Sequence, residues 1–254
     1  MEQNQKIALI TGGSRGLGKN MALQLAQKGT DVILTYNAKK ADAEAVVAEI
    51  ETMGRKAVAL QLNVAEIASF EGFMQQVANV LQEKWNTGSF DFLVNNAGIG
   101  ATVPFAQVTE ANFDEMLNVH FKGVFFLTQK ALPLLNDGGR IINLSSGTTR
   151  FGVPGYITYA SMKGAVETLT KYLAKELGPR NIAVNVLAPG AIETDFNNAA
   201  LRNNPQMKTF LATQTALGRV GEAADIGGIV AFLCSHEARW ITGQRLEASG
   251  GMFL

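Results

Sequence analysis

The stretch Thr11-Gly12-Gly13-Ser14-Arg15-Gly16-Leu17-Gly18 directly follows the apolar run from Ile7 to Ile10. Its glycines allow the chain to turn tightly from a strand into a helix, with the amides of the helix N-terminus open to an anion. On its own such a loop is only a tight strand-to-helix turn. In a chain that alternates strands and helices, it predicts a site for the pyrophosphate of a dinucleotide.

That alternation is visible along the whole chain, because short apolar runs rich in β-branched residues are separated by longer stretches of helical period. It predicts an α/β fold, a single Rossmann domain over residues 1–254 with a doubly wound, seven-stranded parallel sheet and helices on both faces. We expect strands near 7–10, 31–35, 57–62, 92–94, 139–144, 183–187 and 245–247, and helices near 16–28, 41–53, 67–84, 110–135, 156–177 and 223–233. Ligands should gather where the first and fourth strands are neighbours, between Gly12 and Asn95.

Composition excludes several other classes of protein. The 254 residues include 22 basic and 22 acidic side chains, so no net field attracts nucleic acid or an anionic membrane. One cysteine, Cys234, and two distant histidines, His120 and His236, predict neither a disulfide nor a metal site. No apolar run approaches the roughly 18 residues of a membrane span, and the first six residues are polar. We expect a cytoplasmic protein with no metal.

The second predicted strand indicates which dinucleotide is bound. It ends in Thr35-Tyr36-Asn37, without the acidic residue that accepts a hydrogen bond from the ribose 2′-hydroxyl of NAD. Arg15, with Lys39 and Lys40 nearby, supplies positive charge for a 2′-phosphate. NADP(H) is therefore the preferred cofactor, with NAD(H) possible.

A second cofactor element, Asn95-Asn96-Ala97-Gly98, follows the strand at 92–94. Its small residues allow a ribose to lie close, and its asparagine amides can hold neighbouring strand ends together. The alternative is an asparagine-rich turn with no ligand.

Catalytic residues are predicted from one pair and its context. Tyr159 and Lys163 are four apart in a predicted helix and therefore share one face. Ser146 lies 13 residues before Tyr159, at the end of the fifth strand and on the ligand side of the sheet. Reduction of a ketone needs an acid at the developing alkoxide, and a nearby ammonium lowers the pKa of a tyrosine toward that task. The serine hydroxyl would orient the carbonyl and stabilise the alkoxide.

Over essentially its whole length the chain resembles the short-chain dehydrogenase/reductase family. The matching residues are Thr11-Gly12-x-x-x-Gly16-x-Gly18, Asn95-Asn96-Ala97-Gly98, Ser146, Tyr159-x-x-x-Lys163, Asn185, Pro189-Gly190-x-Ile192-x-Thr194 and Gly250-Gly251. The resemblance implies that Ile192 and Thr194 hold the nicotinamide carboxamide and that Arg15 marks NADP preference. It also implies that Asn63-Val64, where the family often has Asp-Val, lies against the adenine.

The resemblance is strongest to 3-oxoacyl-[acyl-carrier-protein] reductases and related ketone or sugar-alcohol branches. It further implies a homotetramer, with the helices near 110–135 and 156–177 packed across one two-fold axis and the segment 250–254 near another. We expect the apolar end Met252-Phe253-Leu254 to be buried.

One position departs from the family. Members usually have an asparagine three residues before the glycine that matches Gly123, where it supports a water relay to the lysine, and this chain has His120. Neutral imidazole offers one donor and one acceptor and can hold the same water. Asn118 is no simple substitute, because two residues turn an α-helix by roughly 200°. His120 therefore has two open roles, one in the proton relay and one in packing alone.

Together these features predict an NADP(H)-dependent oxidoreductase that transfers a hydride between the nicotinamide and a carbonyl or secondary alcohol, as a ketone or 3-oxoacyl reductase. The alternatives are an NAD(P)+-dependent alcohol or sugar dehydrogenase and a non-catalytic dinucleotide-binding sensor or scaffold.

We expect a substrate lid at 195–217 and an apolar pocket formed by Phe105, Phe151, Phe196, Met207 and Phe210. The expected catalytic residues are Ser146, Tyr159, Lys163 and His120, and the expected cofactor-binding residues are Gly12, Ser14, Arg15, Gly16, Leu17, Gly18, Tyr36, Asn37, Asn63, Val64, Asn95, Ala97, Gly98, Tyr159, Lys163, Pro189, Gly190, Ile192 and Thr194.

Overall fold

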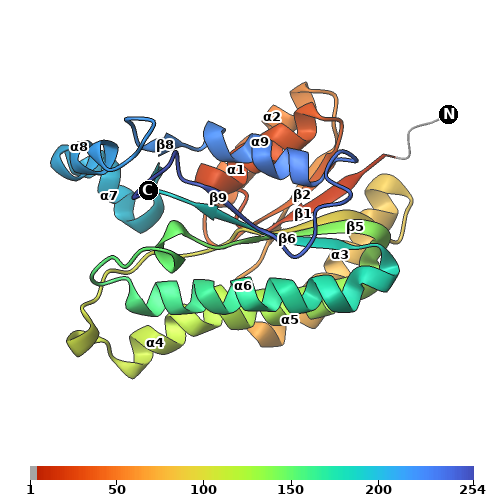
Figure 1. Cartoon of the computed structure of the whole chain (residues 1–254). Coiled ribbons are helices and arrows are strands. Elements are labelled where there is room, and N and C mark those ends of the chain that lie inside the picture. Colours follow the sequence, from red (N-terminus) through yellow and green to blue (C-terminus); the bar gives the residue numbers. More distant parts are fainter. Residues whose placement is uncertain (1–4) are drawn as a thin grey trace.

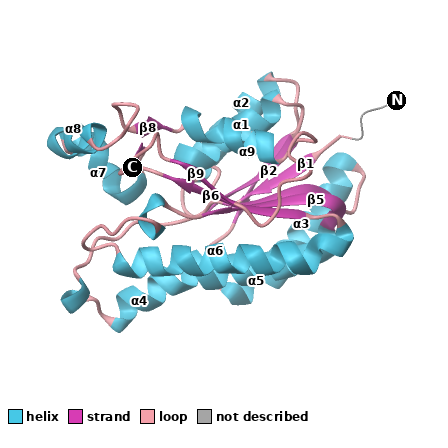
Figure 2. Ribbon diagram, viewed as in Figure 1, coloured by secondary structure: helices cyan, strands magenta, loops and turns pink. Residues whose placement is uncertain are grey.

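A seven-stranded, wholly parallel sheet forms the centre of the molecule, as expected (Figure 2). The structure, a computed structural model, describes residues 5–254, apart from the side chains at 197 and 198. The strands are β1 (Ile7–Ile10), β2 (Asp31–Tyr36), β3 (Ala57–Gln61), β4 (Phe90–Asn95), β5 (Leu135–Leu144), β6 (Ala183–Pro189) and β9 (Arg245–Ala248), in the order β3-β2-β1-β4-β5-β6-β9. The first and fourth strands are neighbours, so the predicted switch point is confirmed.

Helices cover both faces of the sheet (Figure 1). One face carries α1 (Gly16–Gln27), α2 (Lys40–Thr52) and α9 (Ala224–Leu233), and the other carries α3 (Phe70–Trp85), α5 (Gly123–Ala131) and α6 (Ile157–Leu177), with α4 (Glu110–Leu117) against α6. The single-turn helices are η1 (Ile67–Ser69), η2 (Phe105–Gln107), η4 (Leu132–Leu134), η5 (Gly147–Thr149) and η6 (Gly178–Arg180). Among the described residues, no helix is long and apolar enough to cross a membrane.

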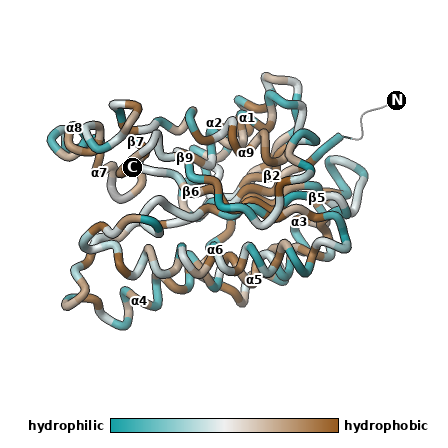
Figure 3. The backbone as a smooth tube through the Cα atoms, viewed as in Figure 1, coloured by the Kyte–Doolittle hydropathy of each residue, from teal (hydrophilic) through white to brown (hydrophobic). Residues whose placement is uncertain are grey.

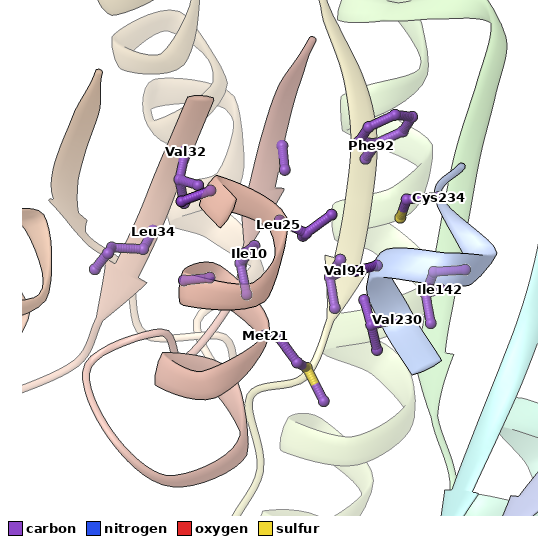
Figure 4. Close-up of a cluster of buried hydrophobic side chains, with 14 of the residues drawn as sticks. Ile10, Met21, Leu25, Val32, Leu34, Phe92, Val94, Ile142, Val230 and Cys234 are labelled. Carbon is purple, nitrogen blue, oxygen red and sulfur yellow. The ribbon is translucent and has the colours of Figure 1, made fainter. Parts of the chain in front are cut away.

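Each face of the sheet has its own apolar core. Alternate residues of β1 point to opposite faces, so Ala8 and Ile10 join one core while Ile7 and Leu9 join the other. In the first core Met21 and Leu25 of α1 and Val230 of α9 lie over the strands (Figure 4). Burial on both faces explains why the strands are continuous apolar runs, which appear as the hydrophobic centre of Figure 3.

The helix predicted at 110–135 is present, but it contains an irregular turn that the sequence did not indicate. A π-helical turn, η3 (Asn118–Lys122), separates α4 from α5, and β5 already begins at Leu135. A Cβ on Gly123 would lie 2.4 Å from the Val64 carbonyl oxygen, so α5 packs closely against this backbone. Pro133 lies in η4, where the helix ends, because proline has no N–H to continue it.

The segment 195–217 contains two short helices that its sequence signal did not reveal, α7 (Phe196–Asn203) and α8 (Pro205–Thr213). The Asn204 side chain caps α8 by accepting from the Met207 N–H at 2.9 Å, and Pro205 occupies the first turn. A small parallel pair, β7 (Ile192–Glu193) and β8 (Gly221–Glu222), ties the two ends of this region together. No residue of α8 is buried, so it has no apolar stripe facing a core.

Candidate active site

The glycine turn at residues 11–18 needs glycine for two separate reasons. Gly12 and Gly16 have φ angles of +66° and +55°, which L-residues rarely adopt. At Gly18 a Cβ would lie 2.1 Å from the Gly12 carbonyl oxygen, so α1 can begin this close to β1 only without a side chain. The result is an open cradle of backbone at the N-terminus of α1.

Asn96 holds this turn against the end of β4. Its Nδ2 donates to the carbonyl oxygens of Thr11 at 2.8 Å and Gly12 at 3.1 Å. In return the Thr11 hydroxyl accepts from the backbone N–H groups of Asn96 and Ala97, each at 3.0 Å. Asn96 therefore has the role expected of the asparagine amides at residues 95–98, which is to hold neighbouring strand ends together.

Asn95 and Asn185 belong to the interior of the sheet. The Asn95 Nδ2 donates to Thr128 and Asn143, and the Asn185 Nδ2 donates to the Ile241 carbonyl oxygen at 2.7 Å. Asn95 does not line the cavity described below, so we do not include it among the residues proposed to bind the cofactor. It is the last residue of β4, and its amide contacts Thr128 of α5 and Asn143 of β5 rather than the glycine turn.

A cavity of about 770 Å³ runs along the carboxyl ends of the strands. With the exception of Asn95, every expected cofactor-binding residue lines it, and so do Ser146 and His120. It also contains Asn96 of the expected cofactor element, and four residues to which the sequence gave no place in the site, namely Ile99, Val119, Met252 and Phe253. Of the five expected apolar pocket residues, Phe105 lies outside the cavity and is 76% exposed.

Positive charge gathers at the end of the cavity near β2. Arg15 precedes α1, is exposed, and has no acidic partner among residues 5–254. Lys39 lines the cavity with its Nζ 3.8 Å from Asp42, whereas Lys40 pairs with Glu44 and lies outside it. Arg15 is therefore the least neutralised cation at this end.

At the other end, Ser146 follows β5 and Tyr159 and Lys163 lie on α6. The Ser146 Oγ accepts from the Thr148 N–H at 3.2 Å and forms a hydrogen bond with the Tyr159 hydroxyl. The Lys163 Nζ donates to the Leu144 carbonyl oxygen at 2.7 Å and lies 5.6 Å from the centre of the Tyr159 ring. The three residues predicted from a sequence spacing are therefore brought together in one cavity.

Burial controls the protonation of this group. It raises the pKa of Tyr159 to about 12, against the opposing effect of the Ser146 hydrogen bond, and it lowers the pKa of Lys163 to about 8. Burial outweighs any effect of the Lys163 charge, so the pKa of Tyr159 is raised rather than lowered as expected. Tyr159 carries its proton at neutral pH.

His120 lies in η3, fully buried, with its ring edge-on to that of Tyr159 at 5.0 Å between centroids. Its Nε2 is 2.8 Å from the Ile99 carbonyl oxygen and 3.3 Å from the Ile99 nitrogen, and we assign the ring proton to Nε2 so that it donates to the carbonyl over the shorter contact. Burial, with the charge of Lys163, holds the pKa of His120 well below its ordinary value. The imidazole is neutral, and Nδ1 is a buried acceptor without a partner among the described residues.

Comparison with known proteins places this geometry in a family. A family model described as enoyl-(acyl carrier protein) reductase matches residues 12–253. The chain is 41% identical over 251 residues to 3-oxoacyl-[acyl-carrier-protein] reductase FabG of Staphylococcus aureus strain Mu50, covering 98% of each protein. The chain belongs to the short-chain dehydrogenase/reductase family. It is accordingly a member of a family of oxidoreductase enzymes.

Solved structures of short-chain dehydrogenase/reductases share the fold over nearly the whole chain. The angucycline C-6 ketoreductase LanV with bound NADP superposes with a TM-score of 0.93 at 38% identity, covering 98% of this chain and 95% of LanV. The promiscuous reductase LugOII, which catalyses keto-reduction at C1 during lugdunomycin biosynthesis, gives a TM-score of 0.93 at 37% identity and covers 98% of both chains. The family-model description names an enoyl reduction while these relatives reduce ketones, so family membership leaves the substrate open.

Proposed function

We propose that this short-chain dehydrogenase/reductase reduces ketones with NADPH. The observation that carries the proposal is one continuous cavity, with the glycine cradle and Arg15 at one end and Ser146, Tyr159 and Lys163 at the other. The first part suits a dinucleotide and the second suits a carbonyl oxygen.

The residues present fit a dinucleotide phosphate. A side chain at Gly18 would clash with the Gly12 carbonyl oxygen, so glycine at this position is what lets the turn close into the cradle at the N-terminus of α1. Gly12 and Gly16 with the α1 N-terminus would hold the pyrophosphate, and Asn63 with Val64 would flank the adenine. Arg15 and Lys39 would bind a 2′-phosphate, which supports NADP(H) over NAD(H), as does the NADP bound to the related LanV.

When bound, the nicotinamide supplies a hydride to the carbonyl carbon. The Tyr159 hydroxyl donates its proton to the carbonyl oxygen, and Ser146 Oγ holds that oxygen in place. Lys163 places a positive charge close to the tyrosine, where it stabilises the phenolate that remains. A pKa of about 12 keeps the tyrosine protonated before the reaction, as a group that donates a proton to a ketone must be.

His120 supports this group in our proposal. Its Nε2–H is held by the Ile99 carbonyl, so one ring nitrogen, Nδ1, is available to accept a hydrogen bond. Proton transfer through the ring would require the hydrogen bond from Nε2 to the Ile99 carbonyl oxygen to break. We therefore favour a positioning role at Tyr159 and Ile99, with the relay as the alternative that mutation decides.

Residues 195–217 form a substrate lid in the same proposal. Phe196, Leu201, Met207 and Phe210 of α7 and α8 line the cavity over the catalytic end. An exposed ion pair between Lys208 and Glu193 attaches the lid to β7, and such pairs are weak restraints. We expect NADPH with the alcohol product to slow proteolysis within this segment, and unchanged cleavage would exclude a lid.

Self-association as a homotetramer is a further part of the proposal. Large apolar side chains are exposed on the helices expected at one two-fold axis, including Phe113 at 44% and Tyr172 at 67%. Met252 is buried within the chain, while Leu254 is 96% exposed, so the expected burial of the final residues holds only in part. Light scattering that gives a monomer mass would contradict the tetramer.

A ketone panel tests the function. NADPH and NADH are compared at equal concentration with β-ketoacyl thioesters, ketoses, simple ketones and ring ketones, while the loss of nicotinamide absorbance and the alcohol formed are followed. We expect one alcohol to form for each reduced nicotinamide that is oxidised, and we expect a higher kcat/KM with NADPH than with NADH. Cofactor binding with no absorbance loss for any ketone would instead indicate a sensor or scaffold, and faster turnover with NADH would overturn the cofactor preference.

A further inference from the structure

The last residues of the sequence reach the catalytic end of the cavity. We refer to residues 250–254 as the tail, and its Met252 and Phe253 both line the cavity. The Phe253 ring packs against that of Phe151 at 4.9 Å between centroids, with an angle of 57° between the planes. Phe151 follows η5, the turn that begins at Ser146, so the tail meets the loop that carries a catalytic residue.

Backbone contacts hold the tail in one conformation. The Phe253 N–H donates to the Gln214 carbonyl oxygen at 2.8 Å, and Gly250 and Gly251 accept from the two residues that follow Thr215. Phe253 itself has a φ of +52°, in the left-handed region that a bulky residue enters only when its surroundings require it. The tail is thus fastened to the end of the lid.

Arg150 fastens the other side of the tail to the catalytic loop. Its guanidinium donates to the carbonyl oxygens of Met252 and Phe253 and forms a two-pronged ion pair with Glu247. The same group lies 5.3 Å from the centre of the Phe151 ring, on which it stacks. Both aromatic rings are therefore placed by a single arginine.

We propose that Phe151 and Phe253, packed against each other and positioned by Arg150, form one aromatic wall of the cavity, called the aromatic clamp below, that selects flat, apolar ring ketones. This inference rests on the proposed reduction and specifies its substrate class. Aromatic rings bind a planar ring by face and edge contacts that a short acyclic ketone cannot provide. The clamp residues touch the cavity but not the reacting groups, so they determine specificity.

The charges around the clamp agree with an apolar substrate. Among the described residues that line the catalytic end, Asp195 and Lys163 are the charged ones. Lys163 is engaged with the Leu144 carbonyl, and Asp195 is paired with Arg202 at 2.8 Å. A phosphorylated or carboxylated substrate would find no free cation here.

The test compares a bicyclic ketone, β-tetralone, with an acyclic one, butanone, in the NADPH-loaded protein. We expect Phe253→Ala to lower kcat/KM for β-tetralone about tenfold, or ~1.4 kcal/mol, while that for butanone changes by less than about twofold. Phe253→Tyr should restore β-tetralone reduction, because the ring returns. Leu254→Ala, at an exposed tail position outside the cavity, is the matched control and should resemble the wild type.

Binding provides a second readout that does not depend on turnover. Calorimetry with β-naphthol and NADP+ should show about tenfold weaker naphthol binding to Phe253→Ala than to the wild type. The clamp would be overturned if Phe253→Ala lowered kcat/KM equally for β-tetralone and butanone, or if it lowered neither kcat/KM for β-tetralone nor the affinity for β-naphthol. If the wild type reduces no ketone yet naphthol binding depends on Phe253, the reductase proposal fails and the clamp stands.

Discussion

Replacement of Lys163 by methionine should stabilise the folded protein at neutral pH while it removes activity. Burial lowers the pKa of this lysine from 10.5 to about 8. At about 1.36 kcal/mol for each pH unit, keeping the ammonium charged in the folded protein costs about 3 kcal/mol at neutral pH. Methionine has a similar length and no charge, but it loses the hydrogen bond to the Leu144 carbonyl, worth about 1 kcal/mol. The net expectation is a gain of about 2 kcal/mol.

The pH dependence of this gain identifies its cause. Between about pH 8 and 10.5 the unfolded chain holds a proton on Lys163 that the folded protein has lost, so wild-type stability rises with pH in this window. At about pH 9.5 the buried Lys163 still destabilises the wild type by about 1.4 kcal/mol. This nearly equals the free energy of the hydrogen bond that the methionine variant loses. The advantage of Lys163→Met should therefore almost vanish there.

Urea and thermal unfolding at fixed protein concentration measure the difference. At neutral pH we expect the melting temperature of Lys163→Met to rise by about 4–8 °C. Lys171→Met, an exposed position on the same helix, is the control and should change stability by less than about 0.5 kcal/mol. A variant less stable than wild type at neutral pH, or a gain that does not depend on pH, would refute the electrostatic reasoning.

Three further substitutions test other parts of the cavity. Arg15→Ala should raise KM for NADPH about 10- to 100-fold through loss of a charged hydrogen bond, with little change for NADH, and an equal change for both cofactors in steady-state assays would contradict the assignment. Gly18→Ala places a Cβ 2.1 Å from the Gly12 carbonyl oxygen, so NADPH binding measured by fluorescence titration should be lost, and intact affinity would show that the turn is not the cradle. His120→Ala should lower kcat, and His120→Asn should restore most of it with the wild-type pH profile if the ring only positions its neighbours. A pH profile that His120→Asn alters would support the relay instead, and unchanged kcat and pH profile in His120→Ala would exclude it.

The sequence predicted those features that depend on local chemistry. The parallel sheet and its switch point followed from alternating apolar runs, because strands buried on both faces have few alternatives. The glycine turn followed from backbone conformations that only glycine adopts readily. Tyr159 and Lys163 meet Ser146 because the helix period and the end of β5 bring them to the same edge of the sheet.

Features that depend on tertiary packing were not predictable in the same way. The π-helical turn η3 is followed by Gly123, which packs closely against the Val64 backbone, and hydrophobic periodicity does not record a contact of this kind. Asn95 and Asn96 are adjacent and identical in type, but the end of β4 directs the Asn95 amide to Thr128 in the interior and the Asn96 amide to the glycine turn. The cavity wall formed by Phe253 depends on a contact with Phe151, about a hundred residues away in the chain.

The central claim is that Tyr159 donates the proton in an NADPH-dependent ketone reduction. Its most direct test is single-turnover reduction of a ketone by the NADPH-loaded wild type and by Tyr159→Phe, which retains the ring and lacks the hydroxyl. We expect the wild type to form one alcohol for each NADPH oxidised and the variant to bind NADPH normally but react at least about 100-fold more slowly. A Tyr159→Phe protein that reduces the ketone at the wild-type rate would contradict the claim.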